Sequence, residues 1–176
     1  MTGAARALTP AEAAALIGAG PALLEAELRA LPEGADGFHP APGEWCAREV
    51  LGHLIECDRR GFAGRIDIIL AADSPALAGW DQDAVARARD DCHRDTGDLL
   101  RELATMRAES VKRIAELRPA DLARLGRHPK VGDLRVADLL HEWVHHDRNH
   151  IRQIQANVQA FVWPHMGNAQ RFSAAG

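Results

Sequence analysis

Apolar residues recur at three- and four-residue steps along four long segments of the chain, and this spacing constrains the fold more than any other feature. Such a period is typical of α-helices that bury one face. No segment alternates apolar and polar residues convincingly, so essentially no sheet is expected. The pattern therefore predicts an all-α fold, a four-helix bundle, with helices over about 10–31, 44–70, 94–117 and 136–160.

Proline, glycine and loop length indicate how these helices are connected. Three Pro and three Gly lie within 32–43, so this segment is expected to be a linker. Pro21 is expected to kink the first helix, and Pro119 to end the third. Residues 72–93 form a long crossover between the second and third helices, which permits a topology other than simple up-down-up-down. We expect one domain over 1–176, with a C-terminal tail at 161–176.

Charge and composition narrow the class of protein. The chain has 21 Lys and Arg against 25 Asp and Glu, a net charge of −4, and its arginines are interleaved with acids. Nucleic-acid-binding proteins concentrate basic residues in a patch, so no nucleic-acid partner is expected. The longest uncharged apolar stretch, 13–24, has only 12 residues, and no signal-peptide pattern is seen, so no membrane segment is expected. Three cysteines, an odd number, favour a cytoplasmic protein with reduced thiols.

Histidine is the anomaly of the composition, with nine in the chain and four of them within 141–150. Two pairs are spaced i, i+4: His141 with His145, and His146 with His150. On a helical wheel of about 100° per residue, measured from His146, the apolar side chains fill an arc from roughly 20° to 180°. His150 lies inside this arc at about 40°, whereas His141 and His145 fall among polar residues at about 220° and 260°. The second pair is therefore expected to face the interior, either as metal ligands or as histidines at the edge of the core.

The first pair also spells H-E-x-x-H, the signature in which two histidines bind zinc and a glutamate acts as general base. Such proteases need a third ligand further along the chain, but no Asp or Glu follows Asp147. Arg148 and Ile151 stand where the longer form of the motif needs Gly and His. We interpret the match as a coincidence in a His-rich helix.

A third candidate ligand lies on the second helix. His53 is at the margin of that helix's apolar arc, beside Val50 and Cys57. From the helix alone, it could equally be a hydrogen-bonded histidine of the core.

These residues resemble the DinB/YfiT-like superfamily of four-helix metal proteins. The resemblance covers roughly 10–159. It rests on Trp45, on residues 49–56 (EVLGHLIE) and on residues 146–154 (HDRNHIRQI). In that family one histidine on the second helix and an H-x-x-x-H pair on the fourth bind a divalent metal. The resemblance thus implies a metal site formed by His53, His146 and His150.

Such a site has a definite chemistry. Three neutral imidazoles leave the charge of a divalent ion uncancelled and a coordination position open, as in catalytic metal sites. They suit zinc, nickel or iron alike. Characterised family members include transferases and isomerases that use low-molecular-weight thiols such as bacillithiol or mycothiol, so the resemblance implies a metal-dependent thiol S-transferase acting on small electrophiles. The alternative is a non-catalytic metal- or ligand-binding bundle that acts in sensing or as a dimer, with Phe161 and Trp163 either at a homodimer interface or closing the core.

Two acids fall on inward faces of their helices, Asp147 on the fourth and Asp58 on the second. Buried acids need partners, and Arg65 stands two helical turns after Asp58. An Asp58–Arg65 ion pair is therefore the preferred interpretation, ahead of a role in orienting a ligand histidine. Glu49 and Glu142 each precede a candidate ligand by four residues and are interpreted as solvated, so no catalytic acid or base is assigned.

Overall fold

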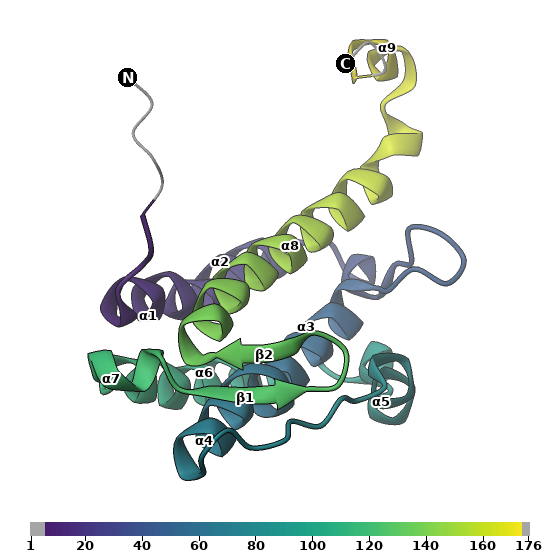
Figure 1. Cartoon of the computed structure of the whole chain (residues 1–176). Helices are drawn as coiled ribbons and strands as arrows, with labels where there is room; N and C mark the ends of the chain where they lie inside the picture. Colours follow the sequence, from purple (N-terminus) through teal and green to yellow (C-terminus); the bar gives the residue numbers. More distant parts are fainter. Residues whose placement is uncertain (1–5, 174–176) are drawn as a thin grey trace.

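Four helical rods form the body of the molecule, as the apolar period predicts (Figure 1). The computed structural model describes residues 6–173. This arrangement confirms the expected four-helix bundle. The first rod is α1 (Pro10–Gly18) with α2 (Gly20–Arg29), the second is α3 (Ala47–Glu56) continued by a π-helical segment η2 (Cys57–Phe62) and α4 (Ala63–Ala71), the third is α6 (Thr96–Ala115), and the fourth is α8 (Val136–Val162).

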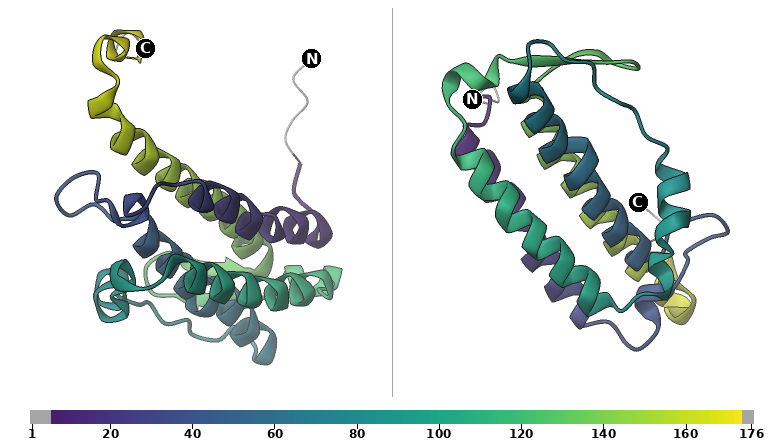
Figure 2. Two further views of the ribbon diagram at one scale, coloured as in Figure 1. Left: turned by 180° about the vertical axis from the view of Figure 1, so that it is seen from behind. Right: turned by 90° about the horizontal axis from the view of Figure 1, so that it is seen from below.

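The rods do not neighbour each other in chain order. Helices α1 and α2 pack against both α6 and α8, and α3 also packs against both. The first and second rods therefore lie diagonally opposite each other, each between the third and the fourth (Figure 2). This order brings α3 against α8, although almost 80 residues separate them along the chain.

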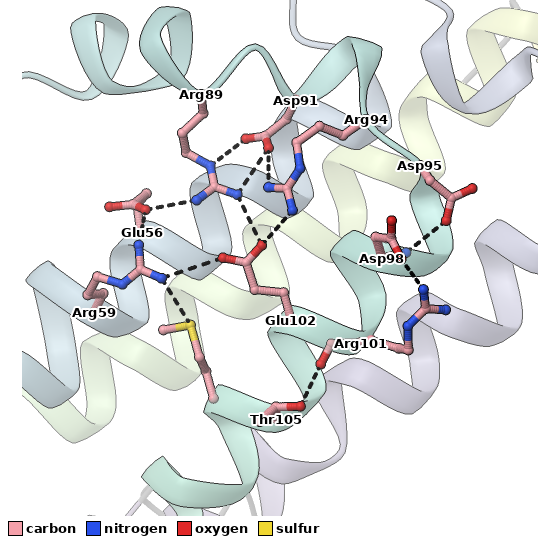
Figure 3. A network of polar contacts seen from close by, with 11 residues as sticks. Glu56, Arg59, Arg89, Asp91, Arg94, Asp95, Asp98, Arg101, Glu102 and Thr105 are labelled. Carbon is pink, nitrogen blue, oxygen red and sulfur yellow. Dashed lines mark hydrogen bonds and ion pairs between the residues drawn. The ribbon is translucent and has the colours of Figure 1, made fainter.

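A network of charged side chains fastens the crossover to the bundle (Figure 3). The crossover contains α5 (Gln82–Arg89) and a 3₁₀ turn η3 (Asp91–His93). Arg89 donates to the buried carboxylates of Glu56, at 2.9 Å, and of Asp91. Gly52 makes this approach possible, because a Cβ there would lie 1.7 Å from Asp91 Oδ2. Charged groups thus hold in place a connection that contributes little to the core.

Two rods are interrupted in ways that a simple apolar period does not show. The first rod divides at Ala19 into α1 and α2, and Pro21 lies in the first turn of α2. The proline therefore marks a boundary between two helices. The second rod widens into η2, where the backbone takes one extra residue in a turn. Gly64 accommodates the change, because a Cβ at that position would lie 2.1 Å from the Arg59 carbonyl oxygen.

The expectation of no sheet is wrong at one place. After a short helix α7 (Pro119–Leu122), strands β1 (Leu125–His128) and β2 (Gly132–Arg135) form an antiparallel hairpin, with Leu125 paired to Arg135. The crossover extends it through two 2.8 Å main-chain hydrogen bonds between Arg127 and residues 75–77. Each strand has four residues and no apolar alternation, so nothing in its side-chain pattern marks it.

The chain continues after α8 as three short turns. These are η4 (Trp163–His165), η5 (Gly167–Ala169) and α9 (Gln170–Ser173). Phe161 packs edge-on against Phe38 with ring centroids 5.4 Å apart, whereas Trp163 is 41% exposed. A homodimer through this region stays a prediction. Within residues 6–173, no helix is both long and apolar enough to cross a membrane.

A polar layer divides the core into two apolar clusters. One cluster gathers around Trp143 and Ile17, and the other around Leu51 and Leu103. Along α6 and α8, the buried polar residues Arg107, Ser110 and Asp147 fall between the positions that join one cluster and those that join the other. The layer consists of His53, Asp58, Arg107, His146, Asp147 and His150.

Arg107 is the charged centre of this layer. Its guanidinium pairs with Asp147 and lies 3.0 Å from Asp58, and all three side chains are at most 4% exposed. The expected Asp58–Arg65 pair is therefore wrong. The extra residue in the π turn breaks the two-turn register that would have aligned them, and Arg65 instead contacts His128 at 3.1 Å. One cation thus connects the second, third and fourth rods.

Removing this cation should destabilise the fold. We expect Arg107→Ala to lower the free energy of unfolding by about 3 to 5 kcal/mol, because it leaves two buried carboxylates unpaired. Urea denaturation followed by circular dichroism measures the change. Arg101→Ala is the matched control on the same helix; its exposed pair with Asp98 should account for less than about 1 kcal/mol. Equal losses in the two variants would show that Arg107 does not hold the layer together.

The same layer predicts a pH dependence. Burial raises the pKa of Asp58 to about 7, with Arg107 opposing the rise, whereas an unfolded aspartate titrates near about 3.9. Between these values the native state binds more protons than the unfolded state, so the contribution of Asp58 to stability is lost as the pH rises through about 7.

Comparison with Asp58→Asn isolates this contribution, since the histidines titrate in both proteins. The unfolding free energy of the wild type, minus that of the variant, should fall as the pH rises from about 4 to about 7 and then level off. Urea unfolding at a series of pH values, in the presence of a chelator, measures it. Parallel pH profiles would contradict the prediction.

Candidate metal centre

The three histidines singled out from the sequence lie together in the polar layer. His53 projects from α3, and His146 and His150 project from successive turns of α8. Each offers a ring nitrogen, and the three nitrogens lie within 4.8 Å of one another. Nε2 of His53 is 3.2 Å from Nε2 of His146. Packing of α3 on α8 thus brings the predicted ligands to a single point.

The spacing of these nitrogens fits a tetrahedral ion. Two nitrogens bound at about 2.05 Å to such an ion are about 3.3 Å apart, close to the separation between His53 and His146. This pair therefore needs little movement to bind an ion, and the His150 nitrogen lies within 4.8 Å of both. The three histidines alone thus provide a donor set of three nitrogens.

Burial keeps the three imidazoles neutral. It lowers the pKa of His53 to about 4 and that of His146 to about 3, with His150 lowering both further. It lowers the pKa of His150 as well. At neutral pH each ring therefore keeps a lone pair that a metal can accept.

The surrounding side chains fix the rings. His53 lies between two indoles, with ring-centroid distances of 5.0 Å to Trp45 and 6.1 Å to Trp80. Nδ1 of His150 donates to Oε1 of Gln153 at 2.8 Å, which leaves Nε2 for an ion. His146 packs against Phe62, and its buried Nδ1 has no hydrogen-bond partner among the described residues. Aromatic packing, more than hydrogen bonding, orients the centre.

Cys57 is a further member of the centre that the sequence analysis did not assign. Its Sγ lies 3.3 Å from Nε2 of His53 and 3.5 Å from Nε2 of His146. Burial, and then the charge of Asp58, raises the pKa of this thiol to about 12, so it stays protonated at neutral pH without a metal. The sign of this role in the sequence is the position of Cys57, one helical turn after His53. Cys57 is thus a protein thiol beside two of the three histidines, where it could approach the coordination position that they leave open.

A pocket of about 770 Å³ opens beside the centre. His146, Cys57 and Trp80 form its inner wall, and the β1–β2 hairpin forms the opposite side with His128 and Lys130. Its remaining lining includes Arg65, Phe62, Asp138 and Glu142. The volume suits a small organic molecule, and both basic and acidic groups face it.

The competing histidine pair takes no part. His141 is half-buried and not on a solvent face as expected: its Nε2 accepts the Leu8 N–H at 2.9 Å, and its Nδ1 donates to the Ala137 carbonyl at 2.7 Å. Leu8, just before α1, contacts His141, which no helical wheel can show. His145 is exposed and bonds to Asn149. The H-E-x-x-H motif therefore does not assemble a metal site.

The fold defines the class of protein, a four-helix bundle, and in this chain its second and fourth rods bring three histidines together. The sequence profile of the DinB superfamily matches residues 16–154, so the chain belongs to that superfamily. The sequence matches none of the curated proteins compared with it.

A solved structure supports the fold. The structure of YfiT from Bacillus subtilis, described as a probable metal-dependent hydrolase with an unusual four-helix bundle topology, is similar with a TM-score of 0.80 and 18% sequence identity. The similarity covers 90% of this chain and 93% of YfiT. At this level of identity the similarity concerns the fold.

Removing one ligand tests the centre. We expect His146→Ala to lower the bound divalent metal by about one equivalent per chain, because two imidazoles from different rods no longer enclose the ion. His145→Ala, one residue away on the exposed face, is the matched control and should leave the metal content unchanged. Mass spectrometry of metals in protein purified without a nickel column measures both. Loss of metal in the control alone would mean that the other face of α8 binds it.

Proposed function

We propose that this protein is a divalent-metal-dependent S-transferase that joins a low-molecular-weight thiol to a small electrophilic molecule. One observation carries the proposal: three neutral imidazoles converge on one point, and one of them, His146, lines a pocket of about 770 Å³. Zinc, nickel or iron would suit the donor set. His53, His146 and His150 would hold the ion.

The bound ion would supply a positive charge that lowers the pKa of a coordinated thiol, whose ordinary value is about 8.5. The protein's own residues prepare the site for this. The imidazoles add no negative charge, so none of the ion's charge is cancelled. Trp45 and Trp80 flank His53 and keep water from its ring faces. Arg65 and Lys130 line the pocket and can bind an anionic group of either substrate.

Hydrolysis is the second candidate, favoured by a particular side chain. Glu142 lines the same pocket one helical turn before His146, where its carboxylate could take a proton from a water molecule. The description of YfiT as a probable metal-dependent hydrolase agrees with this chemistry. The two candidates therefore differ in the nucleophile, a thiol or water.

A transfer assay separates them. Bacillithiol, mycothiol and glutathione are each incubated with a panel of alkylating electrophiles, and the thioether product and the hydrolysed electrophile are measured by mass spectrometry. We expect thioether formation in the metal-loaded protein, and a loss of roughly 100-fold or more after chelation or in His150→Ala. Equal rates in all three samples would refute the transferase.

Two variants identify the nucleophile. Cys57→Ser should retain transfer, because the attacking thiol comes from the substrate; loss of transfer with the metal still bound would assign the sulfur to the protein. Glu142→Gln should leave transfer within about twofold but reduce hydrolysis by about 10²-fold or more, the contribution of a general base. Metal binding without turnover of either kind would favour a bundle that only binds its ligand.

A further inference from the structure

A second group of metal-binding side chains lies outside the three-histidine centre. His39, Cys46, Glu49 and Cys92 each offer a ligand atom, and the four atoms lie within 4.8 Å of one another. The two sulfurs are 2.9 Å apart, and Sγ of Cys92 is 3.4 Å from Nε2 of His39. Oε2 of Glu49 is 3.6 Å from the other nitrogen of His39. Two thiols, one imidazole and one carboxylate therefore meet where three separate segments come together.

This donor set selects for a particular ion. Cysteine sulfur together with histidine nitrogen is the combination typical of tetrahedral zinc sites. With Zn–S bonds of about 2.3 Å, the sulfurs of such a site are about 3.8 Å apart. Ion binding thus requires Cys46 and Cys92 to separate by about 0.9 Å, which is within the reach of a side-chain rotation. All four ligand types are ones that zinc accepts.

The orientation of His39 supports a ligand role. Its Nδ1 lies 2.8 Å from the carbonyl oxygen of Glu44, which can only accept, so Nδ1 carries the hydrogen. In the neutral ring Nε2 then has a free lone pair, and this atom faces Cys92. A histidine whose second nitrogen donates to a backbone carbonyl is the usual arrangement around protein-bound metals.

Cys46 stands where a bound ion and the helix terminus would both favour its thiolate form. Cys46 caps the N-terminus of α3 and is fully buried, and its sulfur faces the backbone N–H of Glu49. Burial, reinforced by Cys92, raises the pKa of its thiol. A nearby metal charge would reverse that effect, because coordination deprotonates a thiol. The helix terminus adds a partial positive charge of its own.

The framework around the four side chains is already fixed. Arg48 joins the two flanking segments, donating to Asp36 at 2.8 Å and to the Cys92 carbonyl at 2.9 Å. Asp91, next to Cys92, is held by Arg89 and Arg94 in the crossover network (Figure 3). The site therefore does not depend on a loop that must order itself around the ion.

The geometry points to a structural zinc site formed by His39, Cys46, Glu49 and Cys92, which fastens the 30–46 connection and η3 to the start of α3. It is independent of the proposed transferase. Because Trp45 precedes Cys46 and lies against His53, the second ion would also stabilise one wall of the first centre.

Cobalt substitution tests this site directly. The experiment uses a full-length background carrying His146→Ala, His150→Ala and Cys57→Ser, which removes the first centre and its sulfur. Purified protein, reduced and metal-free, is titrated with Co²⁺ under argon. We expect a thiolate-to-cobalt charge-transfer band in the near ultraviolet that saturates at about one ion per chain, together with the visible spectrum of a tetrahedral site.

Three further variants assign the ligands. On the same background, Cys92→Ser and His39→Ala should each reduce zinc retained after dialysis by about tenfold or more, whereas His93→Ala, an exposed neighbour, should not. Cys92→Ser in the otherwise unchanged chain provides a second measurement: it should lose one equivalent of zinc per chain while circular dichroism shows the native helix content.

Two results would overturn the proposal. One is the absence of a thiolate band in a background protein that circular dichroism shows to be folded. The other is a Cys46–Cys92 disulfide in protein purified anaerobically with zinc present, detected as a mass about 2 Da lower together with a linked tryptic peptide. Either would show that the two cysteines do not hold an ion.

Discussion

Arg107 places a permanent positive charge in the middle of an otherwise apolar bundle, and such a charge is tolerated only with carboxylates beside it. Asp58 and Asp147 provide them, from the second and fourth rods. Each acid is a direct neighbour in the chain of a residue at the metal centre, Cys57 or His146. The arrangement that neutralises the guanidinium therefore also sets the positions of groups around the candidate metal centre.

The diagonal order of the rods is what makes a centre between α3 and α8 available. A simple up-and-down bundle would place the second rod beside the first, whereas here both pack between the third and fourth. The long crossover joins the second rod to its neighbour, the third, and contributes little to the core. Its attachment depends on Arg89, Glu56 and Asp91, with Gly52 leaving the necessary space. Charge and a missing side chain thus hold this connection against the bundle, where apolar burial contributes little.

The sequence predicts the parts of this structure that depend on regular helical geometry. The apolar period locates four rods, and one helical wheel separates His146 and His150 from His141 and His145. The period and the wheel both assume a constant rotation per residue. Where that constant fails, the prediction fails: η2 adds a residue to a turn, so Arg65 does not meet Asp58.

Contacts between distant segments are also invisible to a periodicity argument. Arg107 lies on the third rod, whose sequence gave no reason to bury a cation, and it finds partners 49 and 40 residues away. The pairing of Cys46 with Cys92 spans 46 residues and depends on the path of the crossover. The hairpin depends on main-chain hydrogen bonds, which leave no mark in side-chain pattern.

The hairpin separates the lining of the pocket from the three histidines, because the two come from different segments of the chain. It forms the outer wall of the pocket yet contributes none of the three histidines, and its turn at residues 129–131 lies apart from both apolar clusters. Sequence changes in that turn can reshape the pocket without disturbing the ligands, the polar layer or the helix packing. The fold therefore allows the pocket lining to vary independently of the three histidines.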